Sequence, residues 1–134
     1  MRHIFGVFTA LVTAVLIIIM AQMIREGLYP LPPNLDIDDT KTLIQWISSL
    51  PDQAFVIIAI SHSIAAFAAG LISSLVVGRS RMSTGIITMS SVFLLVMVYL
   101  FTYNFPTWFV ITDTIATAIL GFVGAVTGSG RVND

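Results

Sequence analysis

Residues 54–77 read AFVIIAISHSIAAFAAGLISSLVV, a run that contains no acid, no lysine and no arginine. A helix rises about 1.5 Å per residue, so a run of this length covers the roughly 30 Å hydrocarbon core of a bilayer. Within it, His62 has hardly any sequence neighbours with which to form a hydrogen bond. The stretch therefore predicts a membrane-spanning helix and raises the question of what pairs with its imidazole.

Three further apolar blocks accompany this run. The composition is 57% hydrophobic and 10% charged with a mean hydropathy of +0.97, more apolar surface than a 134-residue chain can hide from water. We expect an all-α, integral membrane four-helix bundle that forms a single transmembrane domain over residues 1–134. An alternative for the first block is a secretory signal peptide, but its apolar run is longer than usual for one. The four expected spans are about 4–24, 54–77, 83–103 and 108–127.

Basic and aromatic residues predict the orientation of these spans. Arg2, Arg79, Arg81 and Arg131 flank them on one side, which the positive-inside rule assigns to the cytoplasm together with both termini. The loop 25–53 carries two bases and five acids, a net charge of +2 − 5 = −3, and is expected outside. The aromatic anchors of a headgroup region map to that same outer half: Tyr29, Trp46, Tyr99, Tyr103 and Trp108.

The outer loop 25–53 contains a second structural signal. Its prolines between Tyr29 and Asp39 favour an extended chain, and a short amphipathic helix is expected over about 39–50. Asp38 or Asp39 can cap that helix and Pro51 ends it. It is either a cap packed on the bundle or an interfacial anchor, with a lid or a partner-docking element as the functional alternative. Its apolar face consists of Leu43, Ile44, Trp46, Ile47 and Leu50.

A partner for His62 is found in the last span. Asp113 is the one acid inside any expected span, and a carboxylate in a bilayer must face the bundle interior or water. Each of the two heads a stripe of small residues at four-residue spacing, the pattern by which membrane helices approach closely. We therefore expect His62 and Asp113 to form an intramembrane polar pair. The two helix-packing stripes are Ala66, Gly70 and Ser74, and Thr117, Gly121 and Ala125.

The residue inventory disfavours catalysis. The chain has no cysteine and two histidines, too few ligands for a metal site, and its bases are too scattered for nucleic acid. A serine nucleophile at Ser61 or Ser63 beside His62 lacks any nucleophile-elbow motif. We expect no enzyme activity, no catalytic residue, no metal and no cofactor.

Several segments carry a resemblance. The segments YPLPPNLD at 29–36, SLPDQAF at 49–55, the Ala/Gly-rich second span ending in GR, and FPTWF at 105–109 resemble a group of small bacterial inner-membrane proteins with four predicted spans and no assigned function. This resemblance implies a bacterial inner (plasma) membrane location. It implies no activity, ligand or catalytic residue.

Two function classes follow from these patterns. The first is a structural or interaction protein, as a homo-oligomer or a small subunit of a membrane complex, with the lipid bilayer and itself or other membrane proteins as partners and no nucleic acid. The alternative is a small ion- or proton-coupled transporter or channel that uses the His62/Asp113 pair.

Overall fold

The computed structural model describes residues 1–77 and 81–130, and these form five helices and no strand. All but α2 are long and apolar enough to cross a membrane. These four contain 22 to 27 residues, about 33 to 40 Å of helix. Arg79 and Arg131, on which the expected orientation partly depends, lie outside the described residues. The helices are α1 (Arg2–Leu28), α2 (Thr40–Ser48), α3 (Asp52–Val76), α4 (Arg81–Thr102) and α5 (Thr107–Gly130).

Prolines mark several of the helix boundaries. α1 ends at Leu28, one residue before the Tyr29–Pro30 step, because proline disfavours helical geometry in the residue that precedes it. Pro51, in extended geometry, is the N-cap of α3, and Pro106 directly precedes α5. Local chemistry thus stops and starts the helices near the ends of the apolar blocks.

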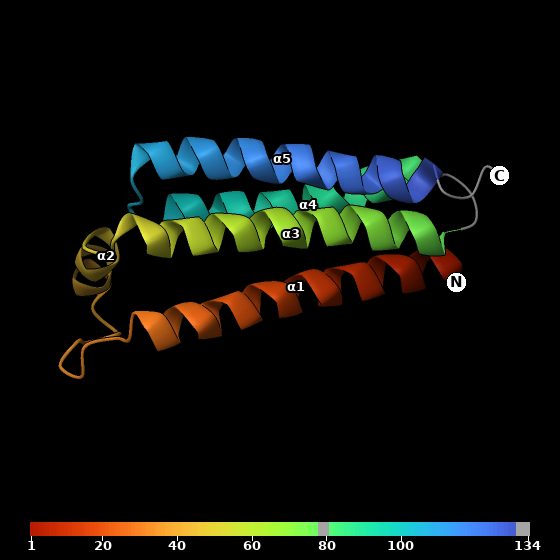
Figure 1. Ribbon diagram of the computed structural model, residues 1–134. Coiled ribbons are helices and arrows are strands. Elements are labelled where there is room, and N and C mark those ends of the chain that lie inside the picture. The colour runs from red at the N-terminus through yellow and green to blue at the C-terminus, as the bar shows by residue number, and fades with distance from the viewer. Residues whose placement is uncertain (78–80, 131–134) are drawn as a thin grey trace.

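The four long helices lie side by side and alternate in direction (Figure 1). α3 is central, because it packs against α1, α4 and α5. α4 and α5 also pack against each other, whereas α1 touches α4 slightly and, within the described residues, does not contact α5. α2 lies at one end of the bundle, which we call the α2 end, and the N-terminus lies at the opposite end (Figure 1).

Glycines bring α3 and α5 into backbone contact. A Cβ added at Gly70 would lie 2.6 Å from the Gly121 carbonyl oxygen, and one added at Gly128 would lie 2.6 Å from the Leu71 carbonyl oxygen. A Cβ at Gly124 would collide with the backbone of Phe67. Helices in lipid gain no hydrophobic free energy from packing together, so van der Waals contact at such close approach is what stabilises their association. The residues of the expected stripes are all buried along the helices: Ala66, Gly70, Ser74, Thr117, Gly121 and Ala125.

α1 is attached least firmly. Its buried residues are Gly6, Ala10, Ala14 and Arg25, and most of its large apolar side chains point outward, as Phe8 does with 66% of its surface exposed. A helix that is apolar all round belongs in a protein core or in lipid. Since α1 has neighbours on one side only, its remaining faces have the chemistry of a lipid-facing surface.

α2 closes one end of the bundle. Asp39 caps it by accepting hydrogen bonds from the Lys41 backbone N–H at 3.1 Å and from the Thr42 hydroxyl at 2.6 Å. The Ser48 hydroxyl donates to the Asn104 carbonyl at 3.2 Å, which joins α2 to the turn between α4 and α5. The expected short helix is therefore present, and its contacts are those of a packing cap.

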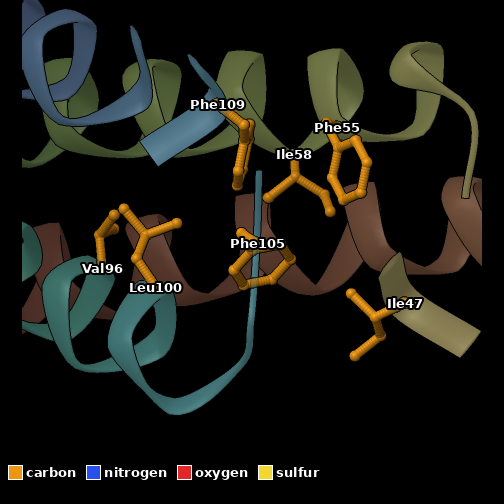
Figure 2. Close-up of a cluster of buried hydrophobic side chains, with 7 residues drawn as sticks. All are labelled: Ile47, Phe55, Ile58, Val96, Leu100, Phe105 and Phe109. Atoms are coloured by element: carbon orange, nitrogen blue, oxygen red, sulfur yellow. The ribbon is translucent and has the colours of Figure 1, made fainter. Parts of the chain in front are cut away.

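Apolar side chains hold that cap in place. Ile47, 5% exposed, joins a cluster contributed by α3, α4, α5 and the turn 103–106, and fully burying such a side chain stabilises by about 1.5 to 3 kcal/mol. Leu43, Trp46 and Leu50 pack partly buried against this cluster, and Ile44 is half-buried. Figure 2 shows the buried members of the cluster: Ile47, Phe55, Ile58, Val96, Leu100, Phe105 and Phe109.

Candidate functional site

The central polar feature of the bundle is a contact between α3 and α5. His62 Nδ1 lies 2.6 Å from Asp113 Oδ2, and the two residues are 4% and 0% exposed. The Thr117 hydroxyl donates to the other carboxylate oxygen, Oδ1, at 3.1 Å. Both oxygens of a fully buried carboxylate are therefore bonded to side chains of the same chain.

The helical register explains how the three side chains meet. α3 and α5 run in the same direction, and His62 and Asp113 stand in the first halves of their helices, at similar distances from the α2 end. Asp113 and Thr117 are four residues apart and hence neighbours on one face of α5. Farther from the α2 end, the small residues of both stripes let α3 and α5 approach closely enough for a direct hydrogen bond between His62 and Asp113.

An aromatic layer separates this pair from the α2 end. The Tyr99 ring meets the His62 ring edge-on, with 5.6 Å between centroids and 85° between planes. Tyr99 in turn contacts Tyr103 and Phe105, and Phe105 packs on Phe109. Sequence patterns did not single out Tyr99 as the cover of the pair, because its role depends on how α4 lies against α3.

The His62–Asp113 pair can carry charge although it is buried, because each group is hydrogen-bonded to the other. With its Nδ1 protonated, the imidazole donates to the carboxylate, and a doubly protonated ring forms an ion pair with no net charge. Hydrogen bonds to charged groups contribute about 1.5 to 3 kcal/mol each, and more is lost when one partner is left buried alone. The hydrogen-bonded pair therefore fastens α3 to α5.

Hydroxyl groups farther from the α2 end are bonded to backbone. Ser73 donates to the Ala69 carbonyl at 2.6 Å, Ser74 to the Arg81 carbonyl at 3.1 Å, and the exposed Thr127 to the Val123 carbonyl at 2.7 Å. Along the same stretch, the glycine contacts bring α3 and α5 into close backbone contact. Nearer the pair, the Ser61 hydroxyl donates to the Ile58 carbonyl at 2.7 Å, and is therefore bonded away from His62.

Among residues 1–77 and 81–130, no three His, Cys, Asp or Glu side chains gather closely enough to hold a metal ion. Gly124 and Gly128 lie beside and beyond the expected stripe and bring α5 into close contact with Phe67 and Leu71 of α3. Arg25, expected in the outer loop, is buried in the last turn of α1.

Comparison with known proteins finds no matching protein-family model, and no curated protein or solved structure is significantly similar to the chain. The four long apolar helices do fit the description of the small four-span proteins that the chain resembles. The function is consequently argued from the geometry of the molecule.

Proposed function

We propose that this chain is an integral membrane protein of structural or interaction type, a homo-oligomer or a small subunit of a membrane complex, in a bacterial inner membrane. Four long apolar helices and the outward-facing apolar surface of α1 support the membrane location. Its partners are the lipid bilayer and copies of itself or other membrane proteins. Both termini are cytoplasmic, and α2 lies on the outer face.

The burial and hydrogen bonding of Asp113 support a structural role over ion or proton transport. Asp113 has no exposed surface, and its two oxygens are occupied by His62 and Thr117. A group that moves ions or protons needs access to water or to further titratable groups along a path. A buried carboxylate with a side-chain partner at each oxygen, next to a glycine-packed contact between helices, serves instead to fasten α5 to α3.

The aromatic residues of the α2 end support its place at a membrane–water interface, and the net negative charge of the loop 25–53 supports the outer side. Tyr29 follows α1, Trp46 stands in α2, Tyr103 lies in the turn after α4, and Trp108 is the second residue of α5. Rings of this kind prefer the level of the headgroups. To test the topology, a reporter active only in the cytoplasm is fused after Asp134, and a cysteine at Asn34 is challenged with an impermeant thiol reagent. An active fusion and outside labelling are expected, and an inactive fusion would overturn the four-span topology.

The test of the assembly is a mass measurement on the complex purified in gentle detergent. A small multiple of the chain mass indicates a homo-oligomer, and additional proteins in fixed ratio indicate a subunit of a larger complex. A stable monomer that retains no partner would contradict the interaction reading.

The buried titratable pair favours a second candidate, a small ion- or proton-coupled transporter or channel. In proteoliposomes, this candidate requires a proton- or sodium-dependent flux in the parent protein that Asp113→Asn abolishes while the fold survives. The exposed Asp52→Asn is the matched control, because it removes an acid from the same end of the bundle. We expect no flux in any of the three proteins, and a flux lost only in Asp113→Asn would replace the structural reading.

A further inference from the structure

Arg25 is a largely buried cation whose Nε has no hydrogen-bond partner among the described residues. The residue is 9% exposed, and its Nε is fully buried with no hydrogen-bond partner. Its nearest acid contact is between Nη2 and Oε1 of Glu26 at 3.8 Å, too long for a hydrogen bond. Removing a charge from water costs several kcal/mol unless hydrogen bonds and an opposite charge compensate. The described residues give the guanidinium one long ion pair and no side-chain hydrogen bond, so a closer anion would stabilise it further.

The surroundings of Arg25 have the character of a membrane–water interface. Its Cζ lies 6.0 Å from the centre of the Trp46 ring, a cation–π distance. In the proposed orientation, this end of α1 is level with the headgroups of the outer leaflet.

An apolar groove reaches the same level. It lies between α1 and α3, has a volume of about 310 Å³, and is lined on α1 from Ile17 to Ile24, the residue before Arg25. Its walls are almost entirely aliphatic, and the facing α3 side chains begin at Ile57. An acyl chain lying in this groove brings its glycerol and phosphate to the depth of Arg25.

We propose that Arg25 binds the phosphate of a phospholipid whose acyl chain occupies the α1–α3 groove, an inference that rests on the proposed membrane location. The planar guanidinium matches a phosphate with paired hydrogen bonds, which no carboxylate of the described chain provides here. A lipid is favoured over a soluble anion because the loop 25–53 has a net charge of +2 − 5 = −3 and repels anions from the water side. A headgroup reaches the site from within the leaflet.

The test compares ligands that differ in one group. The full chain, stripped of lipid in gentle detergent, is melted alone and with phosphatidylglycerol, phosphatidylcholine, diacylglycerol of the same chains, or inorganic phosphate. We expect both phospholipids to raise the melting temperature by about 5 °C at saturation, with little effect of the other two. An equal shift with diacylglycerol would mean that the phosphate is not recognised, and an equal shift with inorganic phosphate would mean a soluble-anion site.

Two variants locate the effect. Arg25→Gln is expected to melt within about 2 °C of the parent without lipid, since it breaks no hydrogen bond of the chain, and to lose the phospholipid shift. Lys41→Gln, at an exposed cation in α2, should keep the shift. Arg25→Lys retains the charge without the fork, so its apparent Kd should rise about tenfold. A full shift in Arg25→Gln refutes the lipid site while leaving the four-span topology intact, whereas a chain recovered outside the membrane fraction refutes the proposed function itself.

Discussion

The buried pair between α3 and α5 predicts strongly non-additive mutations. Asp113→Ala strips the hydrogen-bond partner from His62 Nδ1 and from the Thr117 hydroxyl, and His62→Ala leaves a carboxylate of 0% exposure with Thr117 as its side-chain donor. Breaking a buried pair from one side costs about 3 to 5 kcal/mol, so the two single losses sum to about 6 to 10 kcal/mol. The double mutant leaves no buried charge and loses mainly packing, about 3 to 5 kcal/mol.

Unfolding in detergent by increasing denaturant measures the four free energies of this cycle. A coupling of about 3 to 5 kcal/mol between His62 and Asp113 is expected, the difference between the summed single losses and the loss in the double mutant. The control cycle pairs Asp113→Ala with Thr127→Ala, because the Thr127 hydroxyl is exposed and bonds its own helix, and it should be additive within about 0.5 kcal/mol. If a single Ala variant does not fold, Asp113→Asn with His62→Gln gives a milder cycle. Additivity of the His62 and Asp113 losses would show that the pair does not fasten the helices.

Three further predictions concern the packing and the cap. Gly124→Ala places a methyl group against the α3 backbone and should lower the free energy of unfolding by about 1 to 3 kcal/mol. As a control on the same helix, Gly130→Ala, where nothing lies within 4 Å, should change this free energy by less than about 0.5 kcal/mol. Ile47→Ala should speed amide hydrogen exchange throughout α2, whereas Ile37→Ala, at a side chain with 67% of its surface exposed, should not; unchanged exchange in both would contradict the docking of α2. The hydrogen bonds that Asp39 accepts from a threonine hydroxyl and a backbone N–H lower the pKa of its carboxyl. Its stabilisation of α2 is therefore present above about pH 4 and is lost as pH falls through the lowered folded pKa. Asp39→Asn should remove this acid-dependent loosening of α2, measured by amide hydrogen exchange below about pH 4, and an identical acid response in the variant would refute it.

Several elements of this protein were readable from the sequence because their causes are local. Helix ends depend on proline and on the length of an apolar run, as at Pro51 and Pro106. The cap at Asp39 depends on residues two and three positions later. The meeting of His62 with Asp113 is also local in its origin, because each isolated polar group must find a partner at its own depth in an apolar block.

The tertiary structure determined which residues each helix and each polar side chain contacts. The sequence left α2 open between a packing cap, an interfacial anchor and a lid, and its docking depends on Phe105 and on the shape of the bundle end. That Arg25 Nε has no hydrogen-bond acceptor within the described residues could not be predicted from the loop sequence, since Glu26 is its direct neighbour and still lies 3.8 Å from Nη2. The need of a buried polar side chain for a hydrogen-bond partner is a property of that residue and can be predicted from the sequence. Which partner it finds depends on the distances between helices, and these are determined by close packing in the folded protein.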